Sequence, residues 1–332
     1  MINANNINNW TAPVLLIAAM IILILFQGVF PGYADILYAD GETETEDGGD
    51  FIIYNNIKYK PDKFFIFTVI LNICAFLLPA VFYVRLKGAG YTKNLKLDLR
   101  PGLRYLPLLI YMLFALLSGT VLLNSLMVSG SGEVSPENML PFIINTGGNP
   151  VYDIGVLISF VMLPAFCEEF FFRSVLSAEY EKYGFFCAFM ITSAAFAMTR
   201  FSLRFFLPYL FAGMVFYILA KITYSVMLAV ILHAGYNFFN IYLWDKLSGV
   251  LNFEQNRFIF IFITAIIFMG AIYFVLNSLE IIYYKKAYNN EPSPVYPQGS
   301  RSAPAAGVRF IKSLFSPVFI AAAVIFLVYI NI

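Results

Sequence analysis

Charged residues and histidine are scarce in this chain of 332 residues. Asp, Glu, Lys and Arg make up only 12% of it, while 60% of its residues are hydrophobic. A soluble domain usually carries about 25% charged residues. The formal net charge is +1, so the composition gives no reason to expect a nucleic-acid partner. Histidine occurs once, at His233, which excludes a zinc site built on two histidines.

Cysteine is almost as rare. Cys74, Cys167 and Cys187 are the three present, and each lies in an apolar run. The odd count implies no disulfide framework, and no CxxC metal motif is present. We interpret the three as small buried apolar residues. We expect no cofactor, and the shortage of ligands argues against a metal.

Apolar runs are what the chain has in excess, and a helix needs about 20 such residues to cross a bilayer. We predict an all-α, polytopic transmembrane bundle of about nine spans, or of eight, since the fifth and sixth are barely separated. Lipid is then the first expected partner. The predicted spans are 12–30, 64–84, 104–128, 152–173, 185–202, 204–221, 225–244, 257–279 and 313–331.

The first span, 12–30, has no basic residue before it, unlike a signal peptide. We therefore interpret it as a retained helix, and a signal cleaved near Ala34 stays an alternative.

The charges of the connecting segments predict an orientation. Lys and Arg gather in 85–103 and 280–312, whereas 31–63 contains the acidic run GETETEDGGD and 129–151 has neither Lys nor Arg. The positive-inside rule places the first two connections in the cytoplasm. Nine spans then give a cytoplasmic N-terminus and an external C-terminus. The fourth span would run inward, with its glutamates near the cytoplasmic end.

Three parts follow from this organisation. Residues 1–150 hold the N-terminal spans and the external loop 31–63, and residues 151–245 hold the polar motifs. Residues 246–332 hold the C-terminal spans and a Pro/Ser/Gly-rich linker, 287–307. We expect the last span to be an appended helix behind this linker.

Ionisable residues at membrane depth usually mark a site. Glu169 and Arg173 are spaced i,i+4 and can pair on one helix face. Glu168 points elsewhere and has no partner on its own helix, which leaves its carboxylate available for proton transfer. The seven ionisable residues of this kind are Glu168, Glu169, Arg173, Arg200, Arg204, Lys221 and His233.

His233 and Asn237 share a helix face at i,i+4 spacing. An ordinary interhelical hydrogen bond is the alternative for this pair. For Glu168 the alternative is an interfacial residue that reaches water.

Three motifs on successive spans resemble the type II CAAX prenyl-protease family, also called the CPBP or Abi group of intramembrane endopeptidases. The first is the E-E-x3-R of Glu168 to Arg173, and Pro164 before it also suits the family. The second is the segment from Phe196 to Arg200, where the family has F-x3-H. The third is the H-x3-N of His233 and Asn237. The resemblance covers roughly residues 150–245.

The resemblance implies roles for these residues. Glu168 would be the general base that activates water, His233 and Asn237 would be oxyanion donors, and Glu169 and Arg173 would be supports. Members are often labelled intramembrane metalloproteases. Arg200 stands where the family has a histidine that helps to activate water, and arginine neither accepts a proton nor ligates a metal. It could instead pair with Glu168 or donate to an oxyanion.

Two functional hypotheses follow. The chain is an intramembrane endopeptidase, acting on a membrane-associated or lipidated peptide near the cytoplasmic face. Alternatively, because of Arg200, it is a non-catalytic member that serves as a membrane scaffold, an immunity-type protein or a hydrophobic-peptide binder. A transporter ranks lower, since no paired broken helices are visible. The endopeptidase hypothesis requires Glu168, His233 and Asn237 to converge in one pocket.

Overall fold

The computed structural model describes residues 11–29, 52–54, 57–59, 61–88, 91, 95, 102–131, 144–145, 150–244, 256–288 and 303–330. The acidic run 41–50 and most of the linker 287–307 lie outside these residues.

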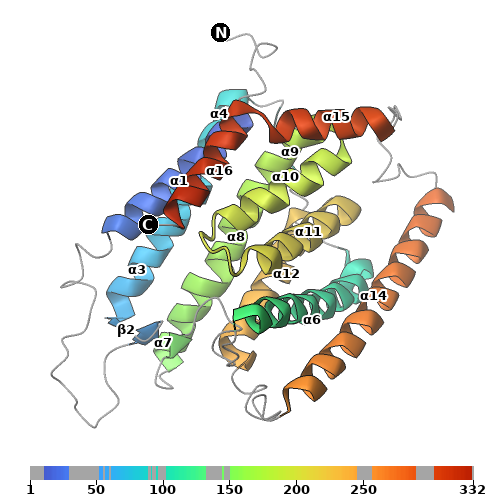
Figure 1. Cartoon of the computed structure of the whole chain (residues 1–332), viewed down its shortest axis with the longest axis horizontal. Coiled ribbons are helices and arrows are strands. Elements are labelled where there is room, and N and C mark those ends of the chain that lie inside the picture. The colour runs from blue at the N-terminus through green and yellow to red at the C-terminus, as the bar shows by residue number, and fades with distance from the viewer. Residues whose placement is uncertain are drawn as a thin grey trace.

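Helices occupy all nine predicted spans, and Figure 1 shows them gathered in one bundle. Six of them are long and apolar enough to cross a membrane, and three apolar helices are shorter. The polytopic helical bundle is therefore confirmed, while the number of spans stays a prediction. The helices are α1 (Thr11–Val29), α3 (Pro61–Asn72), α4 (Leu78–Lys87), α6 (Leu106–Ser131), α7 (Pro150–Val156), α8 (Leu163–Glu169), α9 (Ser177–Tyr180), α10 (Phe185–Met198), α11 (Phe206–Thr223), α12 (Val226–Phe238), α14 (Arg257–Tyr288), α15 (Ala303–Leu314) and α16 (Pro317–Tyr329).

Several spans change their helical winding along their length. A π-helical segment, Ile73–Leu77, joins α3 to α4, and another, Phe239–Leu243, follows α12. The segments Leu157–Met162 and Phe170–Leu176 lie on either side of α8. Single π-helical turns are frequent at functional sites, because they shift the direction in which side chains leave a helix.

The fourth span is longer than predicted. Its helix runs from Pro150 to Tyr183, 34 residues in all, whereas the sequence suggested an end at residue 173. The extension keeps apolar residues on the core side, and Val175 and Leu176 are fully buried. Glu168 therefore lies in the middle of the helix, and its place near the cytoplasmic face of the membrane stays a prediction.

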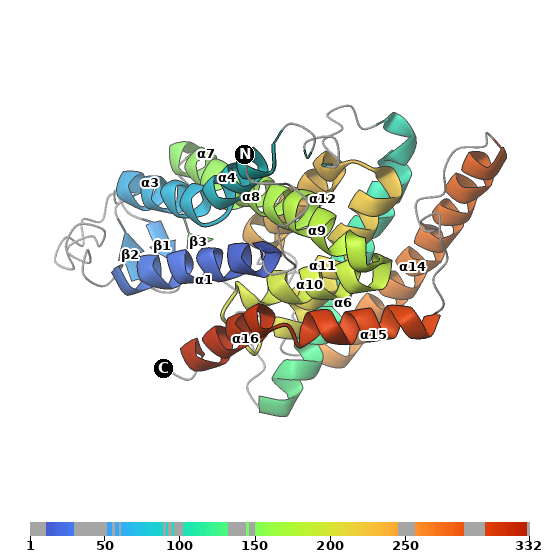
Figure 2. The same cartoon turned by 90° about the horizontal axis from the view of Figure 1, so that it is seen from above.

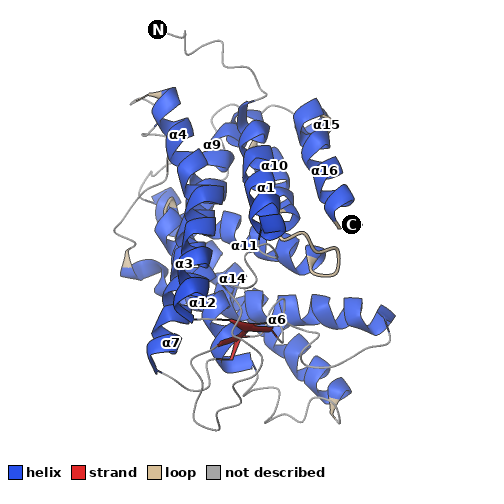
Figure 3. Ribbon diagram, turned by 90° about the vertical axis from the view of Figure 1, so that its left-hand side faces the viewer, coloured by secondary structure: helices blue, strands red, loops and turns tan. Residues whose placement is uncertain are grey.

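Three short strands form a sheet at one end of the bundle, in the order β2–β1–β3, and Figure 3 shows them in red. They are β1 (Ile52–Tyr54), β2 (Ile57–Tyr59) and β3 (Ile144–Asn145). The pairing of Ile53 with Asn145 joins the connection 31–63 to the connection 129–151. Both connections therefore lie at the same end, as the orientation argument requires. Which side of the membrane this end faces stays a prediction.

The C-terminal helix belongs to the core, so the expectation of an appended helix is wrong. Phe319, Ala322 and Phe326 of α16 are buried in the main hydrophobic cluster, and α16 packs along α1 (Figure 2). Packing of this kind is the main source of helix association in lipid. By contrast, α14 packs on α6 and exposes large apolar side chains, such as Phe258, on its other side.

Candidate active site

The two adjacent glutamates end α8, between two π-helical segments. Both are buried: 2% of Glu168 and none of Glu169 is exposed. Burying a charge is costly unless the charge is paired and hydrogen bonded. Each carboxylate has a cationic partner: Arg200, which follows α10, pairs with Glu168, and Arg173 on the same helical span pairs with Glu169.

Glu168 is paired with Arg200. The arginine follows α10, in the turn that leads to α11, and its Nη2 donates to Glu168 Oε2. Glu168 has no partner on its own helix, as predicted. Its carboxylate is nevertheless not free, because Arg200 from another segment pairs with it. An arginine remains protonated at any working pH, so the buried carboxylate of Glu168 faces a permanent cation.

Glu169 has two partners and is more deeply enclosed. Its Oε2 lies 3.1 Å from Nε of Arg173, as the i,i+4 spacing predicts. Its Oε1 lies 2.9 Å from Nδ1 of His233 on α12. A carboxylate next to a guanidinium can only accept, so Nδ1 of His233 carries the proton that points at Glu169. The second glutamate thus fixes the orientation of the only imidazole in the chain.

Arg173 continues this network to a third helix. Its Nη2 donates to the carbonyl oxygen of Gly213 on α11, 3.0 Å away. Gly213 is needed there, because a Cβ at this position would lie 2.9 Å from Cα of Ser193 on α10. The close approach of α10 and α11 therefore depends on this glycine, and so does the position of the carbonyl oxygen that accepts from Arg173.

Aromatic rings complete the surroundings of both arginines. The Phe196 ring lies between them, with its centroid 4.6 Å from Cζ of Arg173 and 5.0 Å from Cζ of Arg200. Tyr209 lies 4.9 Å from Cζ of Arg200, and Phe216 stacks on His233 at 4.7 Å. Nε of Arg200 is buried without a hydrogen bond. Cation–π attraction to these rings partly compensates for that loss.

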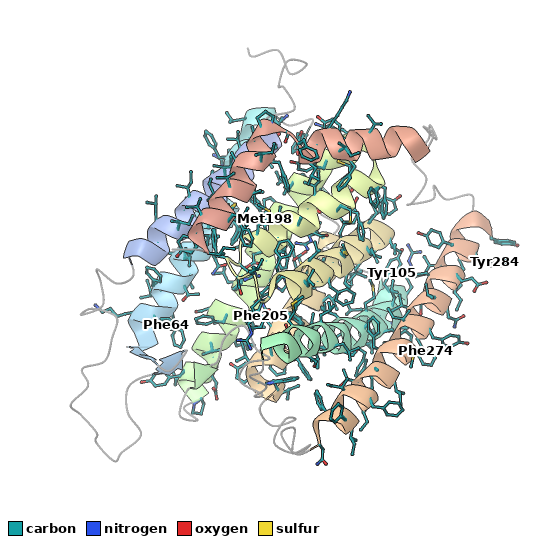
Figure 4. The ribbon with its side chains drawn as sticks, viewed as in Figure 1. Phe64, Tyr105, Met198, Phe205, Phe274 and Tyr284 are labelled. Carbon is teal, nitrogen blue, oxygen red and sulfur yellow. The ribbon has the colours of Figure 1, made fainter. Side chains whose placement is uncertain are left out.

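A cavity of about 260 Å³ opens beside Glu168. Glu168, Arg200 and Asn237 lie on its wall together with apolar side chains of α1 and α3, among them Leu23 and Leu71. Phe205 also lines it, and Figure 4 shows this ring near the centre of the bundle. The cavity is therefore amphiphilic, with one ion pair set among apolar and neutral polar groups.

The predicted convergence is only partly present. Asn237 shares the cavity with Glu168, and its Nδ2 donates to the Phe160 carbonyl at 3.4 Å. His233 is 1% exposed and is not among the residues that line the cavity. It lies behind the wall, attached through Glu169. Lys221 is elsewhere, at the end of α11, where it pairs with Glu181 at 2.9 Å.

The structure adds polar residues that sequence reasoning missed. Thr68 and Asn72 of α3 line the cavity, as do Thr199, Ser202 and Tyr209. Thr68 and Asn72 bond mainly to their own helix: Thr68 Oγ1 donates to Phe64 O and Asn72 Nδ2 to Thr68 O, each at 2.9 Å. Their i,i+4 spacing in an apolar span was the available signal, but neither residue is ionisable.

The residues of the site do not fit a metal. A zinc site takes three or four nitrogen, oxygen or sulfur ligands. No group of three His, Cys, Asp or Glu side chains that could hold an ion occurs in the described part of the chain. Glu168 faces a guanidinium instead of a second ligand. We therefore assign no step to a metal.

Comparison with known protein families gives a match to part of the chain. Residues 150–239 match a family model described as type II CAAX prenyl endopeptidase, Rce1-like. The matched segment contains both glutamates, Arg173, Arg200, His233 and Asn237. No curated protein and no solved structure matches the chain.

Proposed function

Because residues 150–239 match the model of the type II CAAX prenyl endopeptidase family, we propose that the chain is an intramembrane endopeptidase-like protein. The proposed reaction is hydrolysis of a peptide bond in the cavity beside Glu168. The substrate is a membrane-associated or lipidated peptide, since the walls of the cavity are largely apolar. We expect the cleaved bond to lie near the cytoplasmic membrane face, as the charges of the connecting segments predict.

One observation carries the proposal. Glu168, Arg200 and Asn237 come from three different segments of the chain and line one cavity. A carboxylate can act as a base, while a guanidinium and an amide are hydrogen-bond donors. Hydrolysis of an amide needs a base for water and donors for the oxyanion, and these three residues supply both.

The steps use groups of this chain. The Glu168 carboxylate takes a proton from water, and the resulting hydroxide attacks the peptide carbonyl carbon. Asn237 Nδ2 and the Arg200 guanidinium donate to the oxyanion that forms. Glu168 then returns its proton to the nitrogen of the leaving amine, and the C–N bond breaks.

His233 has a narrower role than the family resemblance implies. With Nδ1 donating to Glu169, the neutral ring offers only an acceptor at Nε2. His233 also lies behind the wall of the cavity. We therefore assign it a supporting role, in which it holds Glu169 and packs on Phe216.

Replacement of Glu168 tests the proposal. Glu168→Gln keeps the size of the side chain and removes the base, so cleavage should fall by about 100-fold or more. Purified protein in lipid vesicles would be given a prenylated peptide and the same peptide without the lipid. The matched control is Glu280→Gln, an exposed glutamate on α14, which should cleave at the rate of the unaltered protein. Equal cleavage by both variants contradicts the proposal.

The second candidate is a non-catalytic peptide-binding protein, and the Glu168–Arg200 pair favours it. One oxygen of the Glu168 carboxylate already accepts from Arg200 and is not free to bind a water. In this case neither the unaltered protein nor Glu168→Gln cleaves, yet both bind the prenylated peptide. Arg200→His would then confer cleavage that the unaltered protein lacks, whereas robust cleavage with Arg200 in place rules out this candidate.

A further inference from the structure

Arg200 lies in a strained turn between α10 and α11. The next residue, Phe201, has φ of 47°, in the left-handed region that bulky residues rarely adopt. Such a conformation persists only where its surroundings hold it. On the inner side, the guanidinium of Arg200 lies against the rings of Phe196 and Tyr209.

On the outer side, the turn is held by the C-terminal helix. The ring of Phe201 lies 4.7 Å from that of Tyr329, and the ring of Phe206 lies 5.8 Å from that of Phe326. Phe326 is 5% exposed. Two aromatic contacts therefore bracket the turn that carries Arg200, and both come from α16, more than 100 residues further along the chain.

The position of α16 depends in turn on α1. Ala322 of α16 and Ala19 of α1 are both fully buried, and small residues allow two helices in lipid to approach closely. α1 also contributes Leu23 to the wall of the cavity. The two helices lie side by side in Figures 1 and 2. The same helix pair thus borders the cavity and supports the turn.

We propose that Phe326 and Tyr329 are positioning residues for the Glu168–Arg200 pair. By packing on Phe206 and Phe201, they hold the turn in the conformation that points Arg200 at Glu168. When α16 loosens from α1, the turn relaxes and Glu168 loses its cation. This assignment goes beyond the family segment, 150–239, and holds whether or not the cavity hydrolyses peptides.

Hydrogen exchange of the full chain in lipid nanodiscs tests the assignment. The amides of Arg200, Phe201 and Phe206 donate to Ala197, Met198 and Leu203 at 3.2 Å, so they report on the turn. In Phe326→Ala and in Tyr329→Ala, these amides should exchange about tenfold faster. Amides in the middle of α11 and α12 should keep their rates, which shows that the bundle remains folded.

Two variants separate positioning from general packing. Phe319→Ala removes an equally buried phenylalanine from α16 without a ring contact to the turn, so exchange at Arg200 should stay unchanged. Tyr329→Phe keeps the ring and should restore the slow exchange of the unaltered protein. The assignment is overturned if Phe319→Ala speeds amide exchange in the turn as much as Phe326→Ala does. It is also overturned if the turn exchanges as fast in Tyr329→Phe as in Tyr329→Ala. Because no cleavage is measured, failure here is distinct from failure of the endopeptidase proposal.

Discussion

Arg200 donates through Nη2 to the carboxylate of Glu168, a residue 32 positions earlier on another helix. The carboxylate side chain is 2% exposed and the arginine side chain is 25% exposed. A buried anion is thus neutralised by a cation that borders the cavity. This asymmetry decides how the pair responds to substitution.

Arg200→Ala should destabilise the protein, because it leaves the Glu168 charge buried without a partner. Breaking a buried pair costs about 3–5 kcal/mol, and partial exposure of Arg200 reduces this to about 2 kcal/mol. Chemical unfolding in detergent micelles would measure the change. Adding Glu168→Gln to Arg200→Ala should recover part of the loss, because the unpaired charge is then gone. A double variant less stable than Arg200→Ala would contradict the ion-pair interpretation.

Glu169→Gln should be more harmful to folding than Glu168→Gln. Glu169 and Arg173 are both fully buried, and the same carboxylate also orients His233. We expect a loss of about 3–5 kcal/mol, the cost of breaking a buried pair. Unfolding of the two glutamine variants, measured side by side, checks the order. Equal losses would mean that Glu169 makes no special contribution.

Gly213→Ala should separate α10 from α11. The added methyl group would meet backbone and side-chain atoms of Ser193 and pull the Gly213 carbonyl away from Arg173. Overpacking of this kind costs about 1–3 kcal/mol. Gly270→Ala on α14 is the matched control, because nothing lies within 4 Å of its added Cβ. That variant should gain about 0.5–1 kcal/mol from helix propensity, and a similar loss in both variants would refute the packing argument.

Cysteine labelling should distinguish residues on the two sides of the membrane. Gly88 and Tyr288 are exposed at the C-terminal ends of α4 and α14, and Val151 and Phe258 are exposed at the N-terminal ends of α7 and α14. In a background without native cysteines, a membrane-impermeant maleimide added to intact cells should label only Val151→Cys and Phe258→Cys, as the positive-inside rule predicts. Labelling of the opposite pair would reverse the orientation. Labelling of one member from each pair would refute the arrangement of the helices.

Local patterns were enough for several features of the site. Hydrophobic run length located a helix at each of the nine predicted spans, since a bilayer imposes a similar length on each span, but it did not predict α15. The i,i+4 rule brought Glu169 and Arg173 together, because both lie on the same helical segment. In contrast, the extension of the fourth helix to Tyr183 escaped prediction. Polar residues such as Glu179 and Glu181 interrupt the apolar run there, and their ion pairs to Lys87 and Lys221 become visible only after folding.

The sequence by itself determined that this is a helical membrane protein with its ionisable residues concentrated in one segment, because length, composition and spacing are local properties. Only the tertiary structure decided how those residues are paired. It pairs Arg200 with Glu168 and His233 with Glu169, and it packs α16 against the turn at Arg200. These contacts join residues that are from 32 to more than 100 positions apart in the sequence. Helix packing brings such residues together, and no local sequence pattern encodes it.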